Sequence, residues 1–332
     1  MSKKVKVALY WCASCGGCEE AVVDLAEELL RLSEVIDIVF WPVATDFKKS
    51  DVEAMPDGSI DISIINGGIR LTEHEEMVKL LRRKSKLVVA FGSCSHLGGV
   101  PGLANLFSTD EVLKYVYFES PTVVNSEGVI PREEVVVDDG RKLELPKLLR
   151  YVRSLDQVVD VDYYIPGCAP TPDVIKKSLE TLLSGVLPPK GSVLGASSRS
   201  LCDECELNKT KPEKILLKDI KRVHQVRLDL SKCYLSQGVI CLGPVTRGGC
   251  GTLCIKGGMP CTGCFGPLDK VADYGARALS YIASIVDYDD EAQAEKFVEE
   301  YIVDPVGWFY RYSLPRSLVR GRYEGLRGGA HG

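Results

Sequence analysis

The sequence predicts an α/β fold: a doubly wound parallel sheet in the first half, then a loop-rich second domain stapled by cysteines, then C-terminal helices. Short β-branched runs alternate with segments of helical periodicity over the first 184 residues, as βαβ units do. Beyond that point the periodicity fades, and eight of the thirteen cysteines fall within residues 202–264. Helical periodicity returns only from Asp269.

Five short apolar runs are expected to form the strands of the sheet, and apolar residues recur at helical spacing between them. The predicted strands are Lys4–Trp11, Ile36–Val43, Ile60–Ile65, Leu87–Phe91 and Val161–Ile165. The predicted helices of this half are Glu19–Leu32, Glu73–Arg83, Asp110–Val116, Leu145–Arg153 and Thr171–Leu183. Thr171 is a favourable N-cap residue and Pro172 a favourable first-turn residue, so the sequence marks the start of the last of these helices clearly.

These patterns divide the chain into four segments. Residues 1–184 form the α/β domain, and the Gly- and Pro-rich residues 185–200 form a linker. Residues 201–268 form the loop-rich domain, and residues 269–332 form C-terminal helices and a tail. Because 201–268 has little apolar periodicity, metal sites are expected to supply much of its folding free energy.

Charge and hydropathy exclude several classes of partner. Lys and Arg total 41 against 46 Asp and Glu, a formal charge of -5, so no sequence-wide basic field attracts nucleic acid or anionic lipid. No run approaches eighteen apolar residues, so no membrane span is expected. The opening segment lacks a signal-peptide cleavage site and a twin-arginine pair, so we expect a cytoplasmic protein. In that compartment, clustered cysteines indicate metal binding or catalysis more often than disulfides.

Five cysteines follow predicted strands. Cys12, Cys15 and Cys18 come after the first strand, Cys94 after the fourth and Cys168 after the fifth. The carboxyl ends of parallel strands share one edge of the sheet, so these residues are expected to meet there. A C-x2-C pair alone also suits a thioredoxin-like redox site or a zinc knuckle. Distant cysteines at the same edge argue against the redox pair, although Cys94 and Cys168 taken singly could be buried structural thiols.

The second half has the spacing C-x2-C-x27-C-x7-C-x8-C-x3-C-x6-C-x2-C. Eight cysteines suit two sites of four, either iron-sulfur cubanes or zinc sites. The spacing matches neither a bacterial ferredoxin run nor an ordinary zinc ribbon, and it does not assign cysteines to sites.

Other polar residues give weaker signals. His96 is expected to be a local hydrogen-bond partner, and His74, His224 and His331 to be ordinary surface histidines. Glu19 and Glu20 open a predicted helix, where helix electrostatics is the default explanation of acidic residues.

Several motifs resemble the small subunit of nickel-iron hydrogenases. Cys15-Gly-Gly-Cys18-Glu-Glu20, Gly92-Ser-Cys94 and Pro166-Gly-Cys168-Ala-Pro170 resemble its proximal-cluster motifs. Gly258-Met-Pro-Cys261-Thr-Gly-Cys264-Phe-Gly-Pro267 resembles its distal and medial cluster region. The resemblance runs from about Val5 to Pro267 and is strongest to the cytosolic archaeal enzymes that reduce methyl viologen or a deazaflavin coenzyme.

The resemblance implies a flavodoxin-like first domain, an iron-sulfur-stapled second domain and three 4Fe-4S clusters. The implied proximal ligands are Cys15, Cys18, Cys94 and Cys168. The implied medial ligands are Cys250, Cys254, Cys261 and Cys264, and the implied distal ligands are Cys202, Cys205, Cys233 and Cys241. Cys12 is left over. Cys202 stands where periplasmic members carry a histidine, and Cys254 supplies a fourth medial cysteine that they lack, which favours three low-potential 4Fe-4S clusters.

The function implied by the resemblance is electron transfer, with no catalytic residue in this chain. Its implied partners are a nickel-iron large subunit that activates H2 and an iron-sulfur or flavin acceptor subunit of the heterodisulfide reductase type. Three alternatives stay open at this point: an electron-transfer subunit of a quinone reductase, a reductase of sulfur compounds, and a zinc-stapled interaction module.

Overall fold

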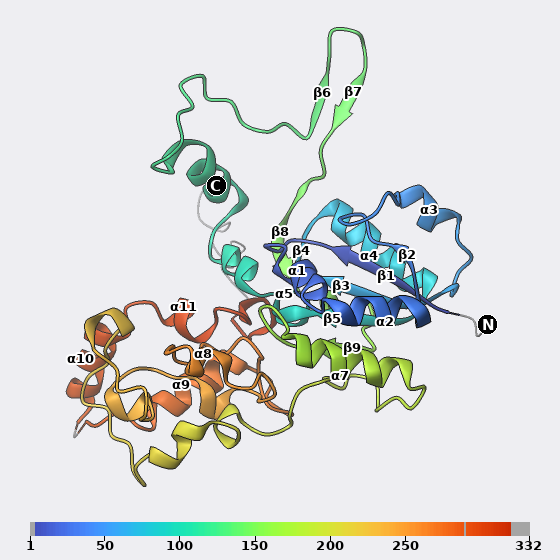
Figure 1. Ribbon diagram of the computed structural model, residues 1–332. Helices are drawn as coiled ribbons and strands as arrows, with labels where there is room; N and C mark the ends of the chain where they lie inside the picture. The colour runs from blue at the N-terminus through green and yellow to red at the C-terminus, as the bar shows by residue number, and fades with distance from the viewer. Residues whose placement is uncertain (1–3, 289, 320–332) are drawn as a thin grey trace.

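The computed structural model describes residues 4–288 and 290–319, and a parallel sheet organises the first half (Figure 1). The strand order is β2-β1-β3-β5-β9, and every pairing in this sheet is parallel. These strands are β1 (Val5–Trp11), β2 (Ile36–Phe40), β3 (Ile60–Asn66), β5 (Ser85–Phe91) and β9 (Tyr163–Ile165). The predicted doubly wound α/β fold is therefore confirmed.

Both faces of the sheet are covered by helices, so neighbouring residues of one strand enter different cores. Val7 and Leu9 of β1 pack on the side of α1 and α7, whereas Ala8 and Tyr10 pack on the side of α3 and α4. The helices of this half are α1 (Gly17–Val23), α2 (Glu27–Val35), α3 (Lys49–Ala54), α4 (Thr72–Lys84), α5 (Gly92–Leu97), α6 (Thr109–Lys114) and α7 (Pro172–Leu183). Burial on both faces explains why these strands are continuous apolar runs rather than alternating ones.

Two predicted elements of the correct type differ from the observed ones by more than two residues at an end. The expected helix Glu19–Leu32 is two helices, α1 and α2, with Ala26 between them at φ +48° and Leu25 buried in the core. The second strand ends at Phe40 rather than Val43, and Pro42 just beyond it has no N–H to donate to a ladder.

The predicted helix Leu145–Arg153 is wrong. Residues Leu148–Arg153 form strand β8, which pairs antiparallel with β4 (Ile69–Leu71). Asn105 fixes this strand from the other side, since its side chain donates to the Val152 carbonyl at 2.9 Å and accepts from the Val152 N–H at 2.7 Å. Apolar residues spaced for a helix adopt a strand here because tertiary hydrogen bonds outweigh local propensity.

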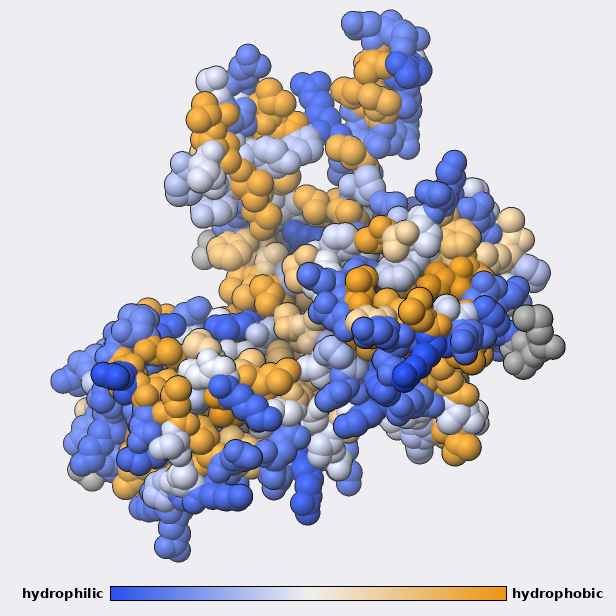
Figure 2. Space-filling model, viewed as in Figure 1, coloured by the Kyte–Doolittle hydropathy of each residue, from blue (hydrophilic) through white to orange (hydrophobic). Residues whose placement is uncertain are grey.

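Residues 107–147 leave the body of the molecule as a projecting arm, which contains α6 and the hairpin of β6 (Glu134–Val136) and β7 (Lys142–Glu144) (Figure 1). Hydrophobic side chains gather on this arm (Figure 2), including Val124, Val129, Val136 and Leu143, all more than half exposed. Across the described residues, no helix has the length and apolar character needed to cross a membrane.

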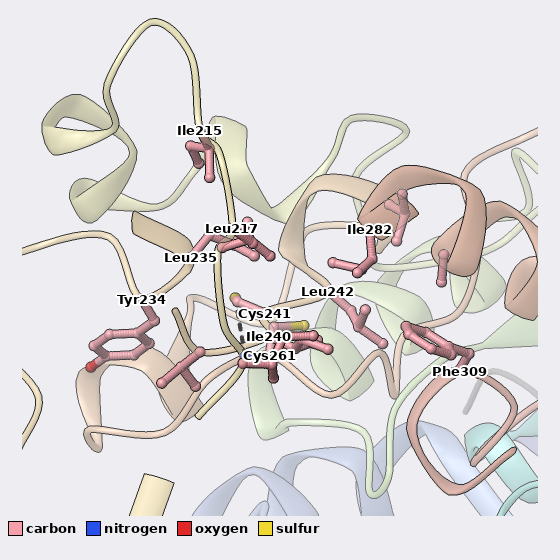
Figure 3. Packing of buried hydrophobic residues seen from close by; sticks show 14 of the residues in the cluster. Ile215, Leu217, Tyr234, Leu235, Ile240, Cys241, Leu242, Cys261, Ile282 and Phe309 are labelled. Atoms are coloured by element: carbon pink, nitrogen blue, oxygen red, sulfur yellow. Dashed lines mark hydrogen bonds between the residues drawn. The ribbon is translucent and has the colours of Figure 1, made fainter. Parts of the chain in front are cut away.

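The second half is built from turns around a separate core (Figure 3). Residues 201–268 form 3-10 turns and the short helix α8 (Leu253–Lys256), and their apolar side chains pack against α9 (Tyr274–Ala283), α10 (Glu291–Tyr301) and α11 (Pro305–Phe309). Leu217, Leu235 and Leu242 are buried together with Ile282 and Phe309. The loop-rich segment thus finds its apolar partners in the C-terminal helices.

The two halves meet along α5 and the loop after β9. The Ser93 hydroxyl donates to the Cys264 carbonyl, the Gly99 N–H donates to the Tyr312 carbonyl at 3.0 Å, and Arg316 donates to the His96 carbonyl at 3.2 Å. This junction brings the cysteine-bearing loops of both halves close together.

Candidate metal centres

The carboxyl edge of the sheet gathers the first group of cysteines. Cys18 lies in the first turn of α1 and Cys94 in α5, while Cys15 and Cys168 lie on loops. Each of Cys15, Cys94 and Cys168 is close enough to interact electrostatically with Cys18. Cys18 and Cys94 are buried and Cys15 and Cys168 are exposed, so the group sits at the protein surface. The structure thus brings these four thiols together at the edge where the strand order placed them.

Two glycines leave room for the sulfurs of this group. Gly92 has φ +79°, and a Cβ there would overlap the Cys18 sulfur. Gly99 has φ +61°, and a Cβ there would overlap Cys94. Any other residue at either position would meet both an unfavourable backbone conformation and a steric clash.

The surroundings of Cys18, Cys94 and Cys168 raise the pKa of their thiols. Burial, with a further contribution from the nearby Cys168 and Cys15, raises the pKa of Cys94 to about 12. Burial and then neighbouring thiols also raise the pKa of Cys18 and of Cys168. Four thiols that repel one another as thiolates are a donor set that a cationic centre stabilises.

Cys12 lies apart from this group. It belongs to the core on the α4 side of the sheet, whereas Cys18 belongs to the core on the opposite face. Its N–H donates to the Asn66 carbonyl at 2.8 Å, and burial raises its pKa. The structure therefore separates the thirteenth cysteine from the other sheet-edge thiols.

A second group consists of cysteines that line one small cavity under the turns of the second half. They are Cys202, Cys205, Cys233 and Cys241. Burial raises the pKa of Cys202 to about 12 and that of Cys241 to about 11, with neighbouring thiols adding to the effect. The Cys241 sulfur accepts the N–H of Cys261 at 3.3 Å (Figure 3), an interaction that lowers the pKa of Cys241 in opposition to burial.

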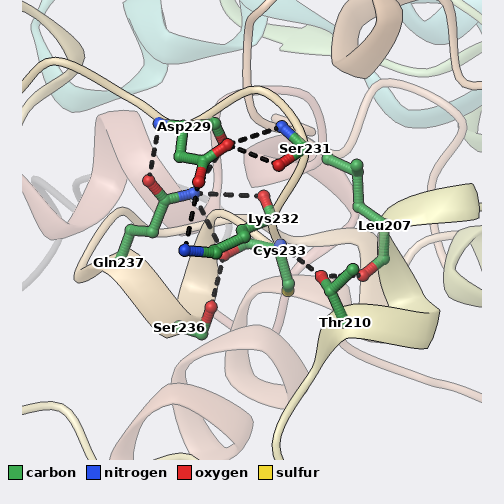
Figure 4. Close-up of polar contacts among 8 residues, drawn as sticks. All are labelled: Leu207, Thr210, Asp229, Ser231, Lys232, Cys233, Ser236 and Gln237. Atoms are coloured by element: carbon green, nitrogen blue, oxygen red, sulfur yellow. Dashed lines mark hydrogen bonds and ion pairs between the residues drawn. The ribbon is translucent and has the colours of Figure 1, made fainter.

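Polar contacts hold the loop that carries Cys233 (Figure 4). The Cys233 N–H donates to the Thr210 hydroxyl at 2.8 Å, and that hydroxyl donates to the Leu207 carbonyl at 2.7 Å. The Gln237 amide donates to the Asp229 carbonyl at 3.0 Å and to the Lys232 carbonyl at 3.1 Å. The 27-residue spacer before Cys233 is thus closed by side-chain hydrogen bonds rather than by a regular element.

The third group lines a neighbouring cavity and consists of Cys250, Cys254, Cys261 and Cys264. Burial raises the pKa of Cys264 to about 12, whereas the Cys168 backbone N–H, which hydrogen-bonds the thiol, lowers it. Two residues of this group lie next to the other groups: Cys264 is beside Cys168, and Cys261 is beside Cys241. The three groups therefore follow one another through the molecule, with this group in the middle.

No three His, Cys, Asp or Glu side chains of residues 4–288 and 290–319 converge on a position for a single metal ion. The second and third groups are each four thiols around a cavity, with backbone N–H donors directed at several sulfurs. This donor set suits iron-sulfur clusters, whose cysteine sulfurs accept such hydrogen bonds.

Two polar residues differ from what the sequence led us to expect, and a third lies outside the described residues. Glu19 is buried and accepts hydrogen bonds from the Trp41 indole and the Asn66 amide, so helix electrostatics does not account for it. Burial raises the pKa of Glu19, opposed by those two bonds. His74 is buried and accepts from the N–H groups of Arg70 and Leu71, so it is no surface histidine. His331 lies outside the described residues.

A family model for the 20 Kd subunit of NADH ubiquinone oxidoreductase matches residues 15–182. The iron-sulfur subunit of the F420-non-reducing hydrogenase of Archaeoglobus profundus is 42% identical over 95% of this chain and 98% of its own. A subunit of the F420-non-reducing hydrogenase of Methanothermobacter marburgensis is 37% identical over 96% of this chain and 97% of its own. A chain of the solved [NiFeSe]-hydrogenase of Dm. baculatum shares the fold, with 17% identity, a TM-score of 0.50 and coverage of 81% of this chain and 96% of that chain.

Fold, cysteine groups and relatives together define the class as the small, electron-transfer subunit of nickel-iron hydrogenases, which are oxidoreductases. Within that class, the chain belongs to the family of iron-sulfur subunits of F420-non-reducing hydrogenases.

Proposed function

We propose that the chain conducts electrons between an H2-activating nickel-iron large subunit and a redox partner through three 4Fe-4S clusters. The observation that carries this proposal is the succession of three four-cysteine groups in space. Cys168 of the sheet-edge group lies beside Cys264 of the middle group, and Cys261 of the middle group lies beside Cys241 of the remaining one. Such a succession of redox centres is what electron transfer across a subunit requires.

The proposed ligand sets follow the three groups. The proximal cluster is held by Cys15, Cys18, Cys94 and Cys168, the medial cluster by Cys250, Cys254, Cys261 and Cys264, and the distal cluster by Cys202, Cys205, Cys233 and Cys241. A bound cluster supplies a centre that accepts and releases one electron. The protein supplies thiolates, N–H donors such as that of Cys261 toward Cys241, and low polarity, all of which influence reduction potential.

The large subunit is proposed to bind at the sheet edge. Cys15 and Cys168 are exposed there, whereas a proximal cluster in a working complex needs protection from solvent. The projecting arm, residues 107–147, adds exposed apolar side chains of the kind that mark protein interfaces. We place the iron-sulfur or flavin acceptor, of the heterodisulfide reductase type, near the distal group, and the complex in the cytoplasm.

Hydrogen-dependent dye reduction tests this division of labour. The chain purified anaerobically with its iron should reduce no viologen dye under H2, because the H2-activating centre belongs to the partner. Addition of the nickel-containing large subunit should produce activity, and Cys168→Ser should abolish it while leaving the proteins able to co-purify. Activity of the chain alone, or full activity of the Cys168→Ser complex, would contradict the proposal.

A further inference from the structure

A cavity of about 290 Å³ that opens to solvent lies in the second half, outside the cavities of the cysteine groups. Its apolar lining consists of Val239, Ile240, Leu242, Met259, Pro260 and Trp308. Cys261 of the middle group also lines it, and Cys261 lies beside Cys241 of the distal group (Figure 3). A partner seated in this cavity is therefore close to two of the proposed clusters.

Basic side chains accompany the apolar ones around this cavity. They are Lys221, Arg222, His224 and Arg311, and no Asp or Glu of the described residues lines the cavity. The Arg222 guanidinium lies 4.5 Å from the centre of the Trp308 ring, and Arg311 Nε donates to the Gly307 carbonyl at 2.9 Å. These contacts hold both guanidinium groups in place, yet neither is paired with a carboxylate of residues 4–288 and 290–319.

The segment that supplies Lys221 and Arg222 is basic along its whole length. Residues 206–232 contain eight Lys or Arg and four Asp or Glu, a net charge of +4, whereas the whole chain has a net charge of -5. Three of the eight form ion pairs, Lys218 with Asp287, Lys221 with Asp219 and Lys232 with Asp229. The other five have no carboxylate partner among the described residues; they are Lys209, Lys211, Lys214, Arg222 and Arg227. Positive charge is thus concentrated on the segment that joins two ligands of the distal group.

Charge and residue type at this surface fit a protein partner with an acidic surface. Arg, Trp and Met are enriched in protein interfaces relative to the rest of a protein surface, and Trp and Arg often contribute most of the binding energy. The cavity presents Arg222, Arg311, Trp308 and Met259, and Met259 is 49% exposed. Opposite charges steer two proteins toward each other, whereas like charges oppose the approach of a basic partner.

We propose that this cavity and residues 206–232 form the docking surface for an acidic electron-acceptor protein, one of whose apolar side chains enters the cavity. The inference rests on the proposed function and adds to it the charge of the acceptor and the place where it binds. Oxidation of H2 at the large subunit releases two protons and two electrons, and a one-electron acceptor takes up the electrons one at a time. An acceptor docked here receives them where Cys261 and Cys241 adjoin.

Steady-state kinetics of the complete complex, with its nickel-containing large subunit, test this surface under H2. The probe is an acidic [2Fe-2S] ferredoxin of the adrenodoxin type, which accepts one electron, and benzyl viologen is the reference acceptor. The KM for ferredoxin should rise at least about fivefold between about 0.05 M and about 0.3 M salt, because salt screens the attraction. Arg222→Glu and Lys221→Glu should each raise this KM at least about tenfold, and should leave kcat and viologen reduction within about twofold.

Arg83→Glu is the matched control, because it makes the same change of charge at an exposed arginine of α4 in the first half, and it should leave the KM for ferredoxin unchanged. If Arg222→Glu loses iron, the result for Lys221→Glu decides, since that side chain is 43% exposed.

Unchanged KM for ferredoxin in the two cavity variants would overturn the proposal and leave the proposed function standing. Failure to reduce ferredoxin by a complex that reduces viologen would do the same. Dimerisation of the complex that Arg222→Glu abolishes would identify a second copy as the occupant and would also overturn the proposal. Absence of viologen reduction by the unmodified complex would contradict the proposed function, and this inference with it.

Discussion

The cysteines of the two halves are held by different kinds of scaffold. The first group lies on loops and short helices that follow the strands of a parallel sheet, and this sheet is held by its own strand pairing and by two apolar cores. The other two groups lie among turns, and their core depends on helices that come later in the chain. There, hydrogen bonds to side chains, such as that from the Cys233 N–H to the Thr210 hydroxyl, hold the backbone in place of hydrogen bonds between strands.

This difference predicts different responses to the loss of metal. A site on a self-supporting sheet can lose its cluster and keep its fold. A site among turns gains folding free energy from the metal, so cluster and fold are lost together. We therefore expect the first half to bind metal on a fold that does not need it, and the second half to need metal in order to fold.

Removing iron by anaerobic chelation should separate the two halves most clearly. Amide hydrogen exchange should accelerate by more than about 100-fold across residues 201–268, because their turns lose the centres that tie them together. Strands β1, β3 and β5 should change by less than about threefold. Equal acceleration in both halves would show that the sheet depends on metal as much as the turns do.

A substitution at the sheet-edge group tests the same contrast, because it disturbs only the site on the sheet. Gly92→Ala places a Cβ on the Cys18 sulfur, so we expect loss of about four irons, the content of one cubane, with the second half unaffected. Gly58→Ala is the matched control, since Gly58 also has a positive φ but nothing lies within 4 Å of its Cβ position. It should keep all iron and lose roughly 1 kcal/mol of stability. Full iron content in Gly92→Ala would show that a Cβ at this position does not disturb the Cys18 sulfur as a ligand.

Asp162 tests whether the first half is stabilised without metal. Its side chain is 4% exposed and binds Arg82 at 2.6 Å, Lys190 at 2.6 Å and the Val88 N–H at 2.8 Å. Asp162→Asn should cost about 2–3 kcal/mol in chemical denaturation of the sheet, with iron content unchanged. Iron loss from the second half would show that the halves are not independent.

The same residue gives the first half a pH dependence. Burial, the largest influence, raises the pKa of Asp162, but the bonds from Lys190, Arg82 and Val88 together lower it below its ordinary value. This contribution to stability is therefore present above the unfolded-state pKa near 4 and is lost as pH falls through the lower folded-state pKa. Asp162→Asn should lack that part of the acid destabilisation.

The mildest change is expected at Cys12. Cys12→Ala removes a buried sulfur that lies on the opposite face of the sheet from Cys18, and should cost about 1 kcal/mol with iron retained. Cys18→Ala is the comparison variant and should lose the iron of the first group. If Cys12→Ala loses that iron and Cys18→Ala does not, the ligand assignment in this loop is wrong.

The convergence of the first group could be predicted because parallel strands fix which loops share an edge. Two strands far apart in sequence, β5 and β9, bring Cys94 and Cys168 together through their pairing. The buried role of Glu19 was missed, because it depends on Trp41 and Asn66, which reach it only after β2 and β3 have paired with β1.

The division of the other eight cysteines could not be derived from spacing. It depends on how 201–268 closes on itself, through contacts such as Cys261 to Cys241. The proximity of Cys264 to Cys168 depends further on the docking of the two halves, which no local pattern specifies. The helical spacing of apolar residues at Leu148–Arg153 gave a wrong prediction for the same reason, since pairing with β4 decides the conformation of this segment.

The proposed electron path requires that twelve cysteines hold three cubanes in succession through the chain. Iron and acid-labile sulfide, determined per chain in protein purified anaerobically, measure this requirement. We expect about twelve of each, four per cubane. About eight iron atoms, or zinc in place of iron, would contradict it.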